Sequence, residues 1–332
     1  MDPLLITVLI TVVLALAFDF INGFHDTANA IATSVSTRAL TPRQAIVLAS
    51  LMNFVGALMF TGVAKTIADG IVDPFGMQNG LLVVIATLIA AIAWNLITWW
   101  FGIPSSSSHA LIGSLAGAGI AAAGFGGINY GGFTKIVIGL LVSPILAFAL
   151  GFAIMFLFKR IFANFAPYKL NKGFRGGQVL SAAFQAFTHG TNDAQKAMGI
   201  ITLALVFAGY QQEVEVAQWV KVAAALAMAA GTAMGGWKII KTMGTKIFKI
   251  EPINGFSADL GSATVILTAT LTHLPVSTTH AITSSILGVG TAKRFAGVRW
   301  NVAGRIVSAW IITIPVSGML GALVYGVIML FR

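Results

Sequence analysis

The chain contains several uninterrupted apolar runs that are long enough to cross a lipid bilayer. An α-helix rises about 1.5 Å per residue, so a hydrocarbon core about 30 Å thick takes about 20 apolar residues. Hydrophobic residues make up 57% of the chain and charged residues only 9%, whereas a soluble domain has about 25% charged residues. These values exclude a water-soluble fold and predict an all-α polytopic membrane protein. The runs are Leu4–Ala17 with an extension toward Asn22, Ala45–Val63, Leu81–Phe101, Ile136–Phe158 and Arg305–Leu330.

Two polar motifs occur twice along this apolar chain, in the same order. The stretch Gly23-Phe-His-Asp-Thr-Ala-Asn-Ala30 aligns with Gly190-Thr-Asn-Asp-Ala-Gln-Lys-Ala197, which places Asp26 on Asp193. The stretch Pro104-Ser-Ser-Ser-Ser-His-Ala110 aligns with Pro275-Val-Ser-Thr-Thr-His-Ala281, which places His109 on His280. An apolar chain that gathers its few polar residues in a duplicated motif has the pattern of a secondary transporter.

The positions of the basic residues predict the orientation of the chain. If the spans alternate, 15 of the 20 basic residues lie on one face, which the positive-inside rule makes cytoplasmic. The N-terminus is then outside and the central loop inside, so each half makes an odd number of crossings and the two halves have inverted topology. The 15 residues are Arg38, Arg43, Lys159, Arg160, Lys169, Lys172, Arg175, Lys238, Lys241, Lys246, Lys249, Lys293, Arg294, Arg299 and Arg305.

This topology predicts the domain organisation of a multi-pass protein of the cell membrane. We expect a first inverted repeat at residues 1–158, a basic cytoplasmic linker at 159–177 and a second inverted repeat at 178–332. Each repeat should have about five helical segments, including a re-entrant hairpin or broken helix. The net charge of +10 follows from the membrane topology, so we expect no nucleic-acid partner.

The second motif of each half adjoins an apolar segment that is too short to span a membrane. These segments are Leu111–Gly124 and Ala281–Thr291. We interpret each as the returning arm of a hairpin or broken helix, with the Pro-Ser/Thr stretch at its tip. Irregular backbone at membrane depth is tolerated only where protein or a water-filled cavity satisfies it. The tips are therefore expected to point at a binding site.

Asp26 and Asp193 occupy equivalent positions, each in a short polar interruption of an apolar segment. A carboxylate buried in a membrane costs on the order of 2–3 kcal/mol or more, so each needs a partner or a function. Carboxylates, amide oxygens and unwound backbone carbonyls form a ligand set for a hard cation. We therefore predict a sodium or metal site at this pair. Hydrogen bonds that pack helices together are the alternative.

Hydroxyl groups stand directly before a predicted helix start in both copies of the second motif, at Ser105–Ser108 and Ser277–Thr279. The unpaired N–H groups and the positive dipole end of such a helix suit an oxyanion. A single cluster of this kind is ordinarily an N-cap, but two in symmetric positions favour an anion site.

Lys196 is the only basic residue inside a predicted span, and it either neutralises Asp193 or contacts the anion. Four of the five histidines, His25, His109, His189 and His280, lie in the repeated motifs. Each could carry a coupling proton or fix a loop by donating to a carbonyl.

These motifs resemble the signature of the inorganic phosphate transporter family, particularly its bacterial low-affinity branch. That signature is a repeated Gly-x-Asn-Asp-x-x-Asn-Ala with Pro-x-Ser-Thr-His hairpin tips in two inverted halves, and the resemblance covers essentially the whole chain. It implies phosphate import by cation symport. The signature carboxylates and amides that bind the coupling cation in the family correspond to Asp26, Asn29, Asn192 and Asp193. The phosphate-binding hydroxyls of the hairpin tips correspond to Ser106, Ser107, Ser108, Ser277, Thr278 and Thr279, and we add Lys196 as a candidate phosphate ligand.

Two positions depart from that signature. His25 replaces the first Asn, and Lys196 replaces the last Asn of the second copy. Fewer amide oxygens weaken sodium coordination, so a proton or a divalent metal that enters as neutral metal–phosphate becomes more plausible, and the coupling ion stays open. Secondary site candidates are His25, Asn22, Gln195, His109 and His280.

Other functions are weighed against phosphate transport. A sulfate permease of the same family is the nearest alternative. An anion channel is disfavoured because paired carboxylates inside the membrane would oppose anion conduction. The chain is not expected to be an enzyme, because no nucleophile–base spacing such as G-x-S-x-G occurs. We expect inorganic phosphate and the bilayer as partners, no covalent cofactor, and a homodimer only by analogy with other transporters.

Overall fold

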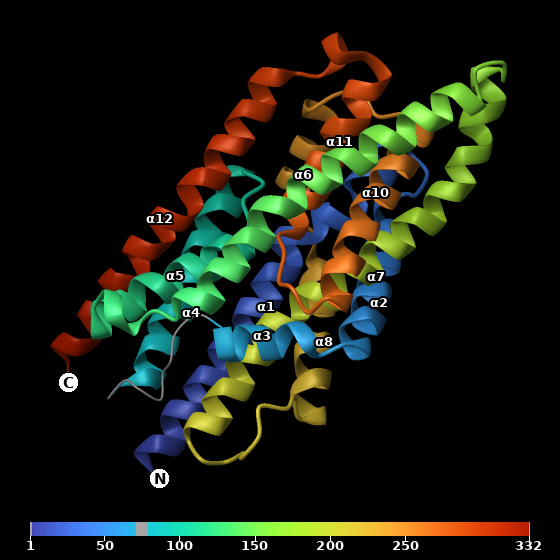
Figure 1. Cartoon of the computed structure of the whole chain (residues 1–332). Coiled ribbons are helices and arrows are strands. Elements are labelled where there is room, and N and C mark those ends of the chain that lie inside the picture. The colour runs from blue at the N-terminus through green and yellow to red at the C-terminus, as the bar shows by residue number, and fades with distance from the viewer. Residues whose placement is uncertain (1, 71–78, 332) are drawn as a thin grey trace.

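The computed structural model describes residues 2–70 and 79–331, and these residues form helices with no strand among them (Figure 1). The first half contains α1 (Pro3–Ser36), α2 (Pro42–Met59), α3 (Gly62–Gly70), α4 (Gly80–Phe101), α5 (Ser107–Ala123) and α6 (Tyr130–Ile161). The second half contains α7 (Pro167–Phe207), α8 (Gln218–Met234), α9 (Trp237–Lys241), α10 (Pro252–Leu271), α11 (Thr278–Arg294) and α12 (Trp300–Leu330).

Five helices of the described chain, α1, α2, α4, α6 and α12, are long and apolar enough to cross a membrane. A sixth span results if α8 and the bent segment that follows it, which turns by 63°, are counted as one. The all-α membrane fold is thus confirmed. The predicted run Ala45–Val63 was too long, because α2 ends where Phe60 takes an extended conformation. Gly62 then begins α3 against the ring of His273, where there is no room for a side chain.

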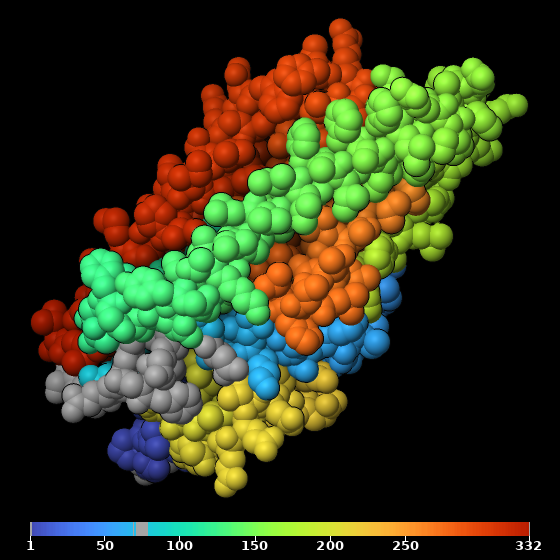
Figure 2. Space-filling model, in the orientation of Figure 1, coloured from blue at the N-terminus to red at the C-terminus, as the bar shows by residue number. Residues whose placement is uncertain are grey.

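Helices of the first half pack mainly on helices of the second half, and the pairs are exchanged in a regular way. The motif helix α1 packs on α8, and its counterpart α7 packs on α2. In the same way α5 packs along α12, while α11 packs along α6. Figure 2 shows α6 in green crossing one face of the molecule between α12 in red and the orange helices of the second half. The two halves therefore share one interior rather than forming two separate bundles.

The motif helices α1 and α7 run antiparallel to each other. Asn22 donates to Asp193, the carbonyl of Asn29 accepts from Gln185, and Thr37 donates to Gln178. Residue numbers on α7 therefore fall as those of their partners on α1 rise. Both termini lie at one end of the molecule, and the α6–α7 turn lies at the other (Figure 1). Residues 159–177 form the end of α6, a short turn and the start of α7.

Both copies of the first motif lie inside continuous helices, so the expected unwound backbone at Asp26 and Asp193 is wrong. Neither copy contains a proline, and their glycines serve close packing instead. A Cβ on Gly23 would overlap the carbonyl oxygen of Met228 in α8, and one on Gly190 would overlap that of Asn53 in α2. Since helical carbonyls bond within the helix, the side chains are left as the main ligands for a cation.

The second motif of each half forms the expected hairpin tip. Residues 102–106 connect α4 to the 17-residue helix α5, and residues 272–277 connect α10 to the 17-residue helix α11. Each short helix begins within the buried interior, because Ser107 and Thr278 are both 1% exposed. The hairpins thereby bring their tips to the middle of α1 and α7.

The close packing of α5 on α12 leads to a stability prediction. A Cβ on Gly117 would overlap the carbonyl oxygen of Gly318, and overpacking of this kind costs about 1–3 kcal/mol. We expect Gly117→Ala to lower the midpoint of thermal unfolding in detergent by several degrees. Gly326→Ala is the matched control, because no atom of the described chain lies within 4 Å of a Cβ at that site in α12. An unfolding midpoint equal to that of the control would contradict the tight α5–α12 contact.

Candidate functional site

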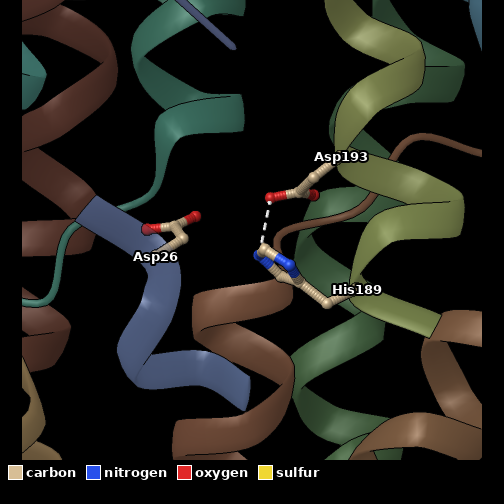
Figure 3. Close-up of side chains that lie close together, drawn as sticks. All are labelled: Asp26, His189 and Asp193. Atoms are coloured by element: carbon tan, nitrogen blue, oxygen red, sulfur yellow. Dashed lines mark ion pairs between the residues drawn. The ribbon is translucent and has the colours of Figure 1, made fainter. Parts of the chain in front are cut away.

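The two motif carboxylates, which are 167 positions apart in sequence, meet where α1 crosses α7. One ligand atom each of Asp26, His189 and Asp193 lies within 4.8 Å of the others (Figure 3). Asp26 is 1% exposed, and the other two are fully buried. The fold therefore brings together the two aspartates at which the sequence predicted a cation site, and their role as cation ligands stays a prediction.

Hydroxyl groups from both hairpin tips donate to these carboxylates. Ser107 Oγ lies 3.0 Å from Asp26 Oδ2, and Thr278 Oγ1 lies 3.1 Å from Asp193 Oδ2. Thr279 Oγ1 also reaches Asp26 Oδ1, at 3.3 Å. The amide of Asn29 donates to both threonine hydroxyls, at 3.2 and 2.9 Å. Each motif helix is thus tied to its own hairpin, and Asp26 and Asn29 also bridge to the hairpin of the other half.

Lys196 neutralises one of the two carboxylates. Its Nζ lies 2.6 Å from Asp193 Oδ1, and the lysine side chain is 1% exposed. An ammonium group at this depth is very costly unless a carboxylate pairs with it. Of the two roles considered for Lys196, the geometry therefore favours the ion pair with Asp193.

His189 presents a ring nitrogen to the carboxylates, and sequence reasoning did not assign it to the cation site. Its Nδ1 lies 2.9 Å from Asn53 Oδ1, an acceptor that places the proton on Nδ1. When the ring is neutral, this tautomer leaves the lone pair on Nε2, which lies 3.3 Å from Asp193 Oδ2. A histidine held through its other nitrogen in this way is the ordinary form of a metal ligand. The spacing of His189 and Asp193, one turn apart on one helix face, is the signal that could have identified it.

Asn192 fastens the second hairpin to α7. Its amide oxygen accepts from the backbone N–H of Val276 at 3.2 Å. Its amide nitrogen donates to Thr270 Oγ1 and to the carbonyl of Leu274, both at 3.2 Å. The side chain predicted to bind the cation is therefore engaged in holding the hairpin tip.

His25, which aligns with Asn192, fastens the first hairpin to α1. Its Nε2 lies 3.0 Å from Thr98 Oγ1 and 3.4 Å from Ser105 Oγ, while Nδ1 lies 2.5 Å from Asp26 Oδ1. The replacement of the signature Asn by His thus keeps the connection to the hairpin. It also ties that connection directly to the carboxylate.

The remaining predicted residues lie around this cluster. Ser106 and Ser277 accept from the backbone N–H of His109 and His280 and are the N-caps of α5 and α11. Ser108 donates to the carbonyl of Val276 at 2.8 Å, and the rings of His109 and His280 lie 4.3 Å apart. Two further side chains are Asn22, which donates to Asp193 at 3.4 Å, and Gln195, which accepts from the N–H of Ala64 at 3.1 Å.

Comparison with known proteins identifies what this arrangement is similar to. A model of the phosphate transporter family matches residues 22–321. A Bacillus subtilis protein named probable low-affinity inorganic phosphate transporter is 61% identical over 326 residues, 98% of each chain. A Rhizobium meliloti protein of the same name is 46% identical over 95% of this chain and 94% of its own length. A solved structure, of the sodium-dependent phosphate transporter, matches with a TM-score of 0.87 at 26% identity, over 98% of this chain and 100% of that one.

The hairpin fastening by Asn192 gives a second stability prediction. Asn192→Ala removes three hydrogen bonds and leaves the buried N–H of Val276 without its acceptor, and each buried unsatisfied group costs about 1–3 kcal/mol. We expect a lower thermal unfolding midpoint in detergent. Asn301→Ala, on an exposed position of α12, should leave the midpoint near that of the unchanged protein. Equal midpoints for the two variants would show that Asn192 does not hold the hairpin.

Proposed function

The chain belongs to the phosphate transporter family, and on this basis we propose that it imports inorganic phosphate by cation symport through alternating access. Its relatives are transporters rather than enzymes. The observation that carries the proposal is one buried cluster in which carboxylates from both halves accept hydrogen bonds from hydroxyl groups of both hairpin tips. The phosphate class comes from the family, and the need for a cation comes from the charges of the cluster.

The charge balance of the cluster explains why phosphate needs a cation. With both carboxylates ionised and His25 and His189 neutral, the aspartates contribute two negative charges to the cluster and the Lys196 ammonium contributes one positive charge. An anion that entered this cluster alone would meet a net negative field in surroundings that screen poorly. An inside-negative potential opposes its import further, by about 2.3 kcal/mol per charge per 100 mV. A cation bound between the carboxylates removes the first barrier and, when carried with phosphate, offsets the second.

The hydrogen bonds of the hairpin tips suggest how the two solutes are coupled. Ser107, Thr278 and Thr279 donate to Asp26 and Asp193, so these hydroxyls are occupied while the carboxylates lack a cation. A cation that binds the carboxylate oxygens competes with these hydroxyl donors. The freed hydroxyls, beside the N-termini of α5 and α11, can then donate to phosphate oxygens. Cation binding would thus create the phosphate site.

The ligands of the cluster favour one class of coupling ion. Two carboxylates and an imidazole nitrogen within 4.8 Å suit a divalent metal, because two carboxylates balance the charge of a divalent ion and imidazole is a common ligand of transition metals. Lys196 pairs with Asp193 while no ion is bound, so Asp26 and His189 are the groups that an incoming ion meets first, before it displaces Lys196 from Asp193. We therefore favour entry of phosphate together with a divalent metal, and keep sodium and proton coupling as the alternatives.

Alternating access follows if the halves are inverted repeats of a transporter in the cell membrane. The antiparallel α1 and α7 and the exchanged packing of α5, α6, α11 and α12 support inversion. The cluster is shielded from solvent, so solutes reach it only when the hairpins move. The positive-inside rule places the N-terminus outside and the α6–α7 turn in the cytoplasm.

The decisive experiment is uptake of labelled phosphate into proteoliposomes. An inward sodium gradient is compared with a proton gradient, each with and without Mg²⁺. We expect Asp26→Asn to abolish uptake under every gradient, because the cation loses its carboxylate. Glu213→Gln, an exposed carboxylate in the α7–α8 turn, is the matched control and should transport normally. Normal uptake by Asp26→Asn would refute the mechanism, and uptake of sulfate without phosphate would assign the chain to sulfate.

His189 provides a separate test of the coupling ion. If its Nε2 ligates a divalent transition metal, His189→Gln should raise the Mn²⁺ concentration for half-maximal uptake at least tenfold. The maximal rate at saturating metal should change much less, because Asp26 and Asp193 remain. An unchanged metal dependence would show that His189 only supports Asn53.

A further inference from the structure

Asp19 is a buried carboxylate that the proposed transport site leaves unused. It lies in α1 with no exposed surface, and neither of its oxygens has a hydrogen-bond partner in the described part of the chain. Asp259, also fully buried, differs sharply because Thr33 and Ser181 donate to its two oxygens, at 2.7 and 2.9 Å. A carboxylate in a membrane helix is costly without a partner, so Asp19 is expected to have a partner in some state of the protein.

The register of α1 on α7 identifies that partner. The hydrogen bonds that pair Asn22 with Asp193 and Asn29 with Gln185 fix the antiparallel alignment. One turn back from Asn22 on α1 is Asp19, and one turn forward from Asp193 on α7 is Lys196, so the two stand level. Asp19 also interacts electrostatically with both Lys196 and Asp193.

Lys196 therefore stands level with two carboxylates on the helix register but contacts only Asp193. Its ammonium contacts Asp193 at 2.6 Å and ends a flexible four-carbon stem that can swing its charge between acceptors. On α1, the positions of Asp19, Asn22 and Asp26 recur at helical spacing, so all three project from one face toward α7. The charge of Lys196 can therefore act on Asp193, which it contacts, and on Asp19, which has no hydrogen-bond partner in the described part of the chain.

We propose, as a deepening of the transport function above, that Lys196 is a tethered cation that passes from Asp193 to Asp19 when the coupling cation binds. The incoming ion takes Asp193 together with Asp26, and the displaced ammonium stays paired because Asp19 receives it. When the ion leaves, Lys196 returns to Asp193. Asp19 is a positioning residue in this scheme, since it acts through Lys196 and touches neither solute.

The exchange makes a specific prediction about cation affinity. Without Asp19, the displaced ammonium has no acceptor, so the cation must bind against a buried unpaired charge. Asp19→Asn should therefore raise the cation concentration for half-maximal effect at least tenfold. Lys196→Gln should lower it, because the cation no longer competes with an ammonium group. Lys196→Gln added to Asp19→Asn should restore the affinity to within about threefold of the unchanged protein.

The first measurement does not depend on transport. Purified protein in detergent is titrated with NaCl, MgCl₂ or MnCl₂ at constant ionic strength, and the shift of the thermal unfolding midpoint gives the half-saturating cation concentration. Asp19→Glu should behave as the unchanged protein, because it keeps the carboxylate. Asp259→Asn is the matched control, since its hydroxyl partner on α7, Ser181, lies about four turns before Lys196, and no rescue by Lys196→Gln is expected.

Rescue of the Asp19→Asn defect by Lys196→Gln supports the exchange, because a merely structural defect would add to the second change. The exchange would be overturned if the two substitutions lowered cation affinity additively, or if Asp19→Asn left the affinity unaltered. It would also be overturned if none of the three salts stabilised the unchanged protein. If Asp19→Asn does not give monodisperse protein, Lys196→Gln alone decides, and a weakened cation affinity would refute the proposal. Failure of phosphate uptake in proteoliposomes would instead count against the transport function, while the titrations still decide the exchange.

Discussion

The crossing of α1 and α7 holds two carboxylates together in a place where water cannot screen them. Charges a few ångströms apart interact far more strongly in such surroundings than in water, so Asp26 and Asp193 must be balanced by other groups. The balance comes from the Lys196 ammonium and from hydroxyl groups of both hairpins. Because these groups come from α7, α5 and α11, any change in the charge at the crossing changes how these helices are held together.

The hairpins are the elements that this charge acts on. His25 and Asn192 occupy equivalent positions, and each connects a motif helix to the loop before α5 or α11. The duplicated chemistry therefore does two things in each half. One residue fastens the hairpin, and the following aspartate faces the site. This arrangement lets the loading of the site and the position of the hairpin depend on each other, which is what a coupled transporter requires.

The sequence predicted the membrane class, the long apolar spans, the hairpin tips and the meeting of Asp26 with Asp193, because hydrophobicity and duplication are properties of the chain itself. It did not predict that α1 and α7 stay helical through the motif. The polar interruption of each apolar segment suggested unwinding, but both motifs are helical, and Gly23 and Gly190 allow close contact with α8 and α2. The roles of His189 and Asn192 also depended on partners more than 80 positions away in sequence, and a single sequence does not show which side chains face each other across helices.

The departures from the family signature have a common physical meaning. His25 forms, through its imidazole, the hairpin contact that Asn192 forms in the other half through its amide. Lys196 replaces a signature asparagine with a lysine. The first change preserves the contact between α1 and the first hairpin. The second brings a basic side chain into the cluster, paired with one of the two carboxylates. A site that already contains one cation of its own needs fewer from solution to admit an anion. On the transport function that we propose, Lys196 then bears on the number of ions carried, and the unpartnered Asp19 is the second acceptor that we infer for its charge.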